Sequence, residues 1–285
     1  MKFRATFFAG ALALVLSGCG TSHVIDKEAE QPEIGITAAA QPDSQAVEKI
    51  NTLFGMTPVV QQAKEAAIAQ CLQAQGLAWE IRPSSGSYDI RSDLSPKPLS
   101  VEEAQEHGYQ ALSANPEQTL PDIDDAAWAA YMGNSDKGSV SVEGISGSIA
   151  ADGCLAQSYE AVFGSAEAGV LFESGISNLP LPYLNAATQD SRITELDKQW
   201  STCMKNQHNV DIATPDLASI DTSMDSHQLA IYDAQCRQTV KYEEVTTDVL
   251  NAYMTTFLAD QEGIIDQLTR AKQTAEKNAP AILNS

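Results

Sequence analysis

Five cysteines are the side chains whose chemistry and spacing carry the most information in this sequence. A cysteine thiol can be acylated or alkylated, oxidised to a disulfide, or used as a metal ligand. One cysteine stands near the start of the chain, and the others are spread over the remainder: Cys19, Cys71, Cys154, Cys203 and Cys236. The last four permit three disulfide pairings.

Cys19 ends the tetrad Leu16-Ser17-Gly18-Cys19, which closes a short apolar segment that starts at Phe7, behind Lys2 and Arg4. About ten apolar residues are too few to cross ~30 Å of hydrocarbon, so the segment predicts a signal peptide. The tetrad resembles the lipobox of bacterial lipoproteins. That resemblance implies cleavage just before Cys19 and a diacylglycerol on its thiol, and two acyl chains anchor a protein stably. We therefore expect a lipid-anchored protein on the extracytoplasmic face of the cell membrane, with the lipid on Cys19 as its membrane contact.

A short internal match favours one pairing of the other cysteines. Cys71 and Cys203 each follow a large apolar residue by three positions, and each has Gln at +4 and Pro at +12. Each is followed later by a second cysteine near an acidic residue, which favours Cys71 with Cys154 and Cys203 with Cys236. A match this short also arises by chance, so duplication of two halves and coincidence both stay open.

The alternative is a metal site made of Cys203, His208, His227 and Cys236. Its Cys-x4-His and His-x8-Cys spacings fit no common zinc pattern. Exported helical cysteines are more often oxidised, so we expect disulfides and no metal.

The constellation Trp200-x2-Cys203-Met204, followed by Asp233-x2-Cys236-Arg237, resembles a group of exported actinobacterial lipoproteins with no assigned activity. Shorter matches extend the resemblance over most of residues 60–240: Ala104-x3-Gly108-Tyr109, Trp128-x4-Gly133, and Gly153-Cys154 with Gly164. Where the group usually has Gly after Cys-Met, this chain has His208. The resemblance implies a helical, disulfide-bonded envelope protein and implies no reaction.

Common catalytic motifs are missing from the sequence. It contains no Gly-x-Ser-x-Gly, Ser-x-x-Lys, His-Glu-x-x-His, Gly-x-Gly-x-x-Gly or Walker pattern. The densest acidic cluster, Asp122-x-Asp124-Asp125, could bind calcium or act as a general acid, but acids in the first turn of a helix also complement its dipole. Trp79, Tyr88 and Tyr109 could line a groove for a sugar or peptide, or could pin loops as partly buried rings. We expect no catalytic residue and no cofactor.

The charge is strongly negative, with 17 basic against 38 acidic residues and a net charge of −21. Loss of Lys2 and Arg4 with the leader would bring the net charge to −23. Such a surface repels polyphosphate, which argues against nucleic acid and anionic lipid headgroups as direct partners.

The elements that must position these side chains are helices. We expect a leader over residues 1–18, a disordered tether over 19–45 and a mainly helical domain over 46–285. Helices are predicted over 58–76, 100–112, 122–132 with Trp128 as its core anchor, 154–163, 187–206 and 225–278 with a break near Gly263. Long irregular connections over 77–98 and 133–153 separate them. The predicted fold class is a mainly α, disulfide-bonded domain, with two related halves as an open alternative.

These observations favour a non-enzymatic lipoprotein that binds a protein partner in the cell envelope. One alternative is the solute-binding lipoprotein of a transporter, although such proteins alternate strands and helices and this sequence does not. Another is a cell-wall glycan hydrolase that uses paired carboxylates, because such enzymes carry no short motif.

Overall fold

The structure is a computed structural model, and it describes residues 35–80, 88–93, 97–112 and 123–285. The chain divides into two units, Met1–Gly35 and Ile36–Ser285. The leader, the lipobox with Cys19 and most of the expected tether lie outside the described residues.

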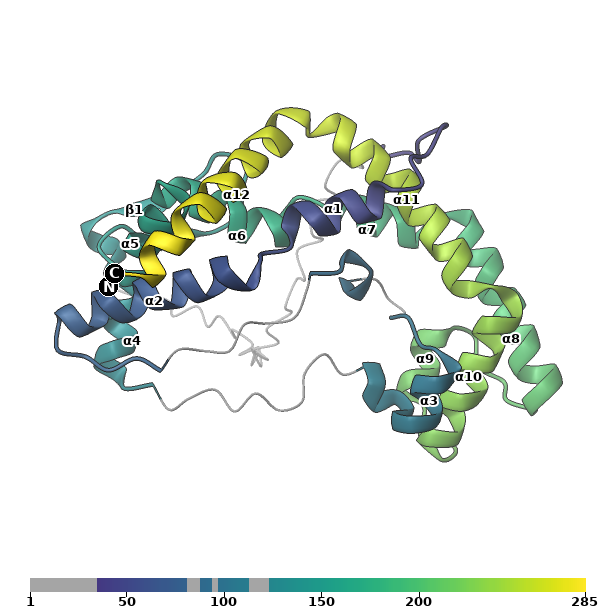
Figure 1. Cartoon of the computed structure of the whole chain (residues 1–285). Coiled ribbons are helices and arrows are strands. Elements are labelled where there is room, and N and C mark those ends of the chain that lie inside the picture. The colour runs from purple at the N-terminus through teal and green to yellow at the C-terminus, as the bar shows by residue number, and fades with distance from the viewer. Residues whose placement is uncertain (1–34, 81–87, 94–96, 113–122) are drawn as a thin grey trace, which may run out of the picture. The chain divides into compact units, whose positions relative to one another are not determined.

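The second unit is mainly α-helical, which confirms the predicted fold class (Figure 1). Its α-helices are α1 Ala46–Phe54, α2 Pro58–Ala74, α3 Val101–His107, α4 Asp125–Met132, α5 Cys154–Phe163, α6 Ala166–Asn178, α7 Leu181–Thr188, α8 Ser191–His208, α9 Pro215–Ile220, α10 Ser226–Val240, α11 Tyr242–Asp260 and α12 Glu262–Leu283. Short 3-10 helices are η1 Ile90–Asp93, η2 Gly108–Leu112 and η3 Ser135–Lys137, and strands β1 Ser139–Ser141 and β2 Ser148–Ala150 form an antiparallel hairpin.

Capping residues start the helices where the sequence predicts. The Thr57 side chain accepts a hydrogen bond from the backbone N–H of Val60, and Pro58 occupies the first helical position of α2. Ser100 and Glu103 form a complete capping box at α3. The expected helix over 100–112 is α3 followed by η2, because Gly108, at φ 58°, ends the α-helical part.

Several elements were not predicted. Glycines and prolines interrupt the apolar pattern of residues 164–188, so this pattern did not predict α6 and α7. The Gly- and Ser-rich segment 133–153, expected to be irregular, contains the β1–β2 hairpin. In α6, Gly169 is required by packing, since a Cβ there would lie 2.2 Å from the Tyr159 ring on α5. The long C-terminal run divides at Lys241, which takes the left-handed conformation at φ 57°, and at Gln261. Gly263 itself lies inside α12, and the break expected near it falls at Gln261, two residues earlier.

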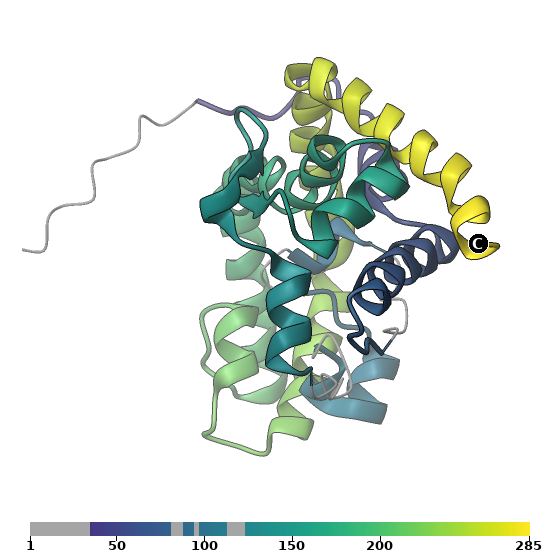
Figure 2. The same cartoon turned by 90° about the vertical axis from the view of Figure 1, so that its left-hand side faces the viewer.

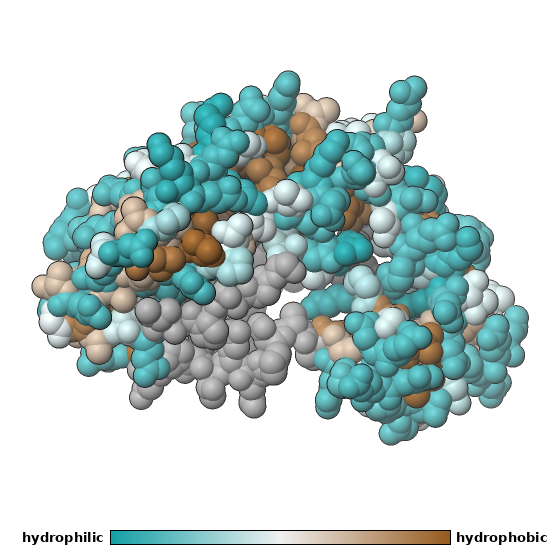
Figure 3. Space-filling view, in the orientation of Figure 1, coloured by the Kyte–Doolittle hydropathy of each residue, from teal (hydrophilic) through white to brown (hydrophobic). Residues whose placement is uncertain are grey.

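Two large apolar clusters hold the helices together. The first contains Phe54, Phe172 and Phe257 and joins α1, α2, α5, α6, α7, α11 and α12. The second contains Trp200, Leu229 and Tyr242 and joins α8, α9, α10 and the start of α11. Helix α11 therefore runs from one cluster to the other, as Figures 1 and 2 show. The face seen in Figure 3 is mostly hydrophilic, as the charge predicts, with apolar patches between the polar side chains.

The ordered domain begins earlier than the expected boundary at residue 46. The N–H of Ala39 donates to the Ala252 carbonyl at 3.1 Å, and the N–H of Asp43 donates to the Thr255 Oγ1 at 2.9 Å. The Thr256 hydroxyl donates to the Thr37 carbonyl at 2.9 Å. Residues 37–43 are therefore held on α11 by hydrogen bonds between positions far apart in sequence, which no local pattern predicts.

Candidate functional site

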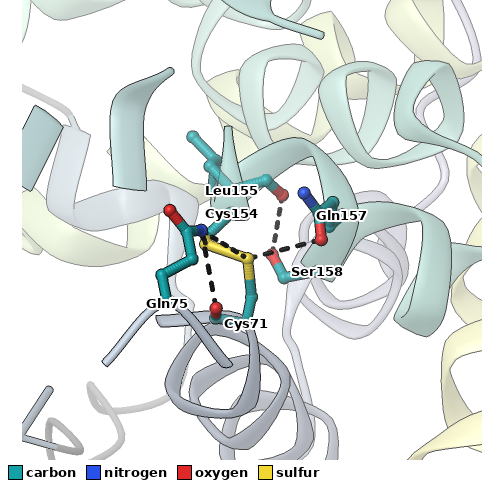
Figure 4. The surroundings of a disulfide bond; sticks show 6 residues. All are labelled: Cys71, Gln75, Cys154, Leu155, Gln157 and Ser158. Atoms are coloured by element: carbon teal, nitrogen blue, oxygen red, sulfur yellow. Dashed lines mark hydrogen bonds between the residues drawn. A yellow bond between two sulfur atoms is a disulfide. The ribbon is translucent and has the colours of Figure 1, made fainter. Parts of the chain in front are cut away.

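The first disulfide joins Cys71, on α2, to Cys154, the first residue of α5 (Figure 4). Gln75, just after α2, donates from Nε2 to the Cys154 Sγ at 3.3 Å and to the Cys71 carbonyl at 3.5 Å. Gln157 approaches the Cys71 Sγ from α5, with its Oε1 at 3.3 Å. Cys154 is buried, whereas Cys71 is half-buried, so this disulfide has one sulfur near solvent.

The second disulfide joins Cys203, on α8, to Cys236, on α10. Trp200, one turn before Cys203, is fully buried with both cysteines in the second apolar cluster. The pairing favoured by the internal match is thus the pairing in the structure. Cys154 starts its helix while Cys236 lies well inside α10, so the match does not extend to the second cysteines, and duplication stays a hypothesis.

A buried polar centre lies beside the second disulfide. The Asp233 carboxylate accepts hydrogen bonds from Trp200 Nε1 at 3.0 Å, Tyr109 OH at 3.3 Å and Arg237 Nε at 2.7 Å. Burial disfavours the charged guanidinium, but the Asp233 carboxylate outweighs it and holds the pKa of Arg237 above its ordinary value. Tyr109 comes from η2, so this centre fixes the segment 97–112 on α10.

The alternative metal site is wrong. Cys203 and Cys236 are bonded to each other, the His208 ring stacks on Tyr232 with centroids 4.0 Å apart, and His227 Nε2 lies 3.1 Å from the Gln105 carbonyl. No group of three or more metal-ligating side chains occurs in the described part of the chain.

The described residues of the acidic cluster lie at the N-terminus of α4. Asp124 is the N-cap of α4 and accepts from the Ala126 N–H at 2.7 Å, and Asp125 is the first helical residue. Both therefore complement the positive end of the helix dipole. Asp122 lies outside the described residues.

The three aromatic residues proposed to line a groove lie apart. Trp79 packs with α4, Tyr88 contacts Phe54 edge-on in the first cluster, and Tyr109 belongs to the polar centre of α10. They do not form a common groove.

Trp79, which follows α2, instead forms a partly exposed aromatic surface together with side chains of α4. The Tyr131 ring stacks on Trp79 with centroids 5.1 Å apart, and Trp128 lies against the same Tyr131 ring at 5.3 Å. Trp128 is 47% exposed and Met132, one turn further along α4, is 42% exposed. We call Trp79, Trp128, Tyr131 and Met132 the aromatic face. The expectation that Trp128 anchors the core is wrong, because the buried residue of α4 is Ala127.

Contacts with α2 support the buried side of the aromatic face. Trp79 Nε1 donates to the Glu65 Oε2 on α2 at 3.1 Å, and Tyr131 packs against the cluster that contains Ile68, Leu72 and Cys154. The Cys71–Cys154 disulfide fixes α2, which carries Glu65, to α5, which α4 contacts. The signal for this face in the sequence is Trp and Met four residues apart in an alanine-rich helix, whose fully buried residue is Ala127.

Comparison with known proteins yields no relative for this chain. No protein-family model matches it, and no curated protein or solved structure matches it either. Within the described ranges, no helix is both long and apolar enough to span a bilayer.

Proposed function

We propose that this protein is a lipid-anchored extracytoplasmic lipoprotein that binds a protein partner of the cell envelope through the aromatic face. The lipobox tetrad Leu16-Ser17-Gly18-Cys19 supports the anchor. Two disulfides in the helical domain support an oxidising location, because disulfides persist outside the cytoplasm.

The observation that carries the binding role is the exposure of Trp128 and Met132 on a supported ring stack. Trp, Tyr and Met are enriched at the centres of protein interfaces, and Trp and Tyr dominate the residues whose truncation costs most binding energy. Tyr131 contacts the Trp128 ring and is itself stacked on Trp79, so the Trp128 side chain loses less freedom on binding than an unsupported ring would.

The surrounding charge indicates the chemistry of the partner. Asp124 and Asp125 lie one turn before Trp128 on α4, and Glu80 follows Trp79. All three are exposed, and the chain carries a net charge of −21. We therefore expect a partner with apolar side chains at its centre and basic residues at its edge, since complementary charge speeds association.

Site-specific photo-crosslinking in cells tests this proposal. A benzophenone amino acid at Ala129, an exposed position three residues before Met132, should form a discrete adduct with one envelope protein. The same adduct should fall at least tenfold when Trp128→Ala is added. The matched control places the crosslinker at Leu217 on α9, which is 49% exposed. An adduct that persists in Trp128→Ala, or forms equally from position 217, would exclude the aromatic face as the binding surface.

The anchor is tested separately. Mass spectrometry of the mature N-terminus should find a diacylglycerol on Cys19, and Cys19→Ser should remove it along with processing. An unmodified Cys19, or cleavage elsewhere, would exclude the lipoprotein assignment. Turnover of isolated wall polymer by the pure protein would instead favour the glycan hydrolase.

A further inference from the structure

A cavity of about 320 Å³ opens between the end of α5, the start of α6 and the middle of α12. These helices lie side by side in Figures 1 and 2. The floor of the cavity is apolar and consists of Phe163, Leu171 and Ala271, all buried. Ligand pockets combine such a floor with a few polar groups, and this volume is at the small end of their range of roughly 300 to 1,000 Å³.

Arg270 lines this cavity without an acidic partner. Arg91, Arg192 and Arg237 each hold a carboxylate at 2.7 to 2.8 Å. Among the described residues, Arg270 is the arginine whose side chain has neither an ion pair nor a hydrogen bond. In a chain with 38 acidic residues, a guanidinium left unpaired at the rim of an apolar cavity is available to a carboxylate from a ligand.

Glu167, from the first turn of α6, lines the same cavity. Its side chain likewise has no ion pair or hydrogen bond within the described part of the chain, and it is not paired with Arg270. Arg270 and Glu167 are both exposed, so the mouth of the cavity presents one unpaired positive group and one unpaired negative group, and the buried floor is apolar.

Polar side chains at the rim have spare hydrogen-bonding capacity. The Ser165 Oγ accepts from the Ala168 N–H at 3.1 Å, which leaves its hydroxyl proton free to donate. Gln267 donates from Nε2 to the Gly263 carbonyl at 3.3 Å, which leaves its Oε1 free to accept. The rim can therefore both donate to a carboxylate and accept from an ammonium group.

We infer that this cavity binds a free α-amino acid with an apolar side chain, with its carboxylate at Arg270, its ammonium at Glu167 and its side chain over Phe163 and Leu171. A zwitterion has no net charge, so the acidic surface does not repel it as it repels a simple carboxylate. A single residue of leucine size suits the cavity volume. This inference does not depend on the aromatic face or on the lipid anchor.

Ligand-observed NMR titration of the purified full-length protein tests the inference with three compounds that share the apolar side chain of leucine and differ in their charged groups. L-leucine should bind, whereas 4-methylpentanoate, which lacks the ammonium, and 3-methylbutylamine, which lacks the carboxylate, should each bind at least tenfold more weakly. Equal binding of either analogue would overturn the inference, as would absence of saturable leucine binding up to about 10 mM.

Matched variants locate the site. Arg270→Gln and Glu167→Gln should each weaken leucine binding at least tenfold, while Lys277→Gln, an exposed unpaired cation on the same helix, and Glu160→Gln, an exposed acid on α5, should leave it unchanged. Ala168→Leu should fill the cavity and abolish binding, and its circular dichroism should match the parent. Leucine binding that survives Arg270→Gln and Ala168→Leu in folded protein would place the ligand elsewhere.

Discussion

Arg237 and Asp233, one turn apart on α10, form a two-pronged ion pair in the interior. Arg237 Nε donates to Asp233 Oδ1 at 2.7 Å and Nη2 donates to Oδ2 at 3.1 Å, with side chains 1% and 0% exposed. Nη1 also donates to the Lys97 carbonyl at 2.6 Å. The pair therefore stabilises α10 and holds the segment 97–112, which is remote in sequence, against it.

Arg237→Met should destabilise the protein by about 3 to 5 kcal/mol, because it leaves the Asp233 charge buried without a partner. The double variant Asp233→Leu/Arg237→Met should recover a large part of that loss. Urea unfolding measures both, and Arg192→Gln, in a more exposed pair, is the control with an expected loss of about 1 kcal/mol or less. A loss in Arg237→Met as small as in Arg192→Gln would contradict the role of the pair.

The two disulfides should differ in their rate of reduction. Cys71 is half-buried, whereas Cys154, Cys203 and Cys236 are buried, so a thiolate reductant reaches the Cys71 sulfur first. Under native conditions with a mild thiol, timed alkylation and mass spectrometry should show Cys71 and Cys154 labelled well before Cys203 and Cys236. Simultaneous labelling of all four would show that reduction follows global unfolding and not local access.

Asp190 should give the protein acid-sensitive stability. It caps α8, accepts from Arg192 Nε at 2.9 Å, and accepts from the Tyr253 hydroxyl at 3.2 Å. The hydrogen bond from Arg192 lowers the pKa of Asp190 to about 2. Since the pKa is lower in the folded state than the unfolded value of about 3.9, this stabilisation is complete above pH 4 and is lost as the pH falls towards 2.

Asp190→Asn keeps an N-cap residue and removes the charge. At pH 7 we expect it to cost on the order of 1 kcal/mol, allowing for solvent screening, and the difference from the parent should shrink between pH 4 and pH 2. Thermal unfolding at a series of pH values checks this. A difference that stays constant down to pH 2 would show that the charge of Asp190 is not involved.

Two glycines should respond in opposite directions to alanine. Gly169→Ala places a methyl group 2.2 Å from the Tyr159 ring and should cost about 1 to 3 kcal/mol through overpacking. Gly263→Ala meets no atom within 4 Å in α12 and should stabilise by up to about 1 kcal/mol through helix propensity. Both shifts are measured by urea unfolding, and a neutral Gly169→Ala would contradict the close approach of α5 and α6.

The sequence alone predicted much of the helical content. Thr57 with Pro58 and Ser100 with Glu103 are local signals, since a cap and the N–H groups it satisfies lie within one turn. Four cysteines with a partial internal match also predicted the pairing that the structure has. The lipobox lies outside the described residues, so the anchor on Cys19 stays a prediction.

Tertiary contacts decided the rest. Trp128 is a large apolar residue of the kind usually found in a core, but Ala127 is the buried residue of α4 and Trp128 is exposed. The rotation of α4 about its own axis is set by its packing against other helices. From the sequence alone, Gly169 indicates a helix break. In the structure it lies within α6, where the close approach of the Tyr159 ring requires a residue without a Cβ. Asp233, Arg237 and Tyr109 form one polar centre, although Tyr109 lies more than a hundred residues before Asp233 in the chain. Phe163 and Arg270, which are also more than a hundred residues apart, line one cavity. Local sequence fixes hydrogen bonds within a turn, whereas contacts between distant segments depend on how whole helices pack.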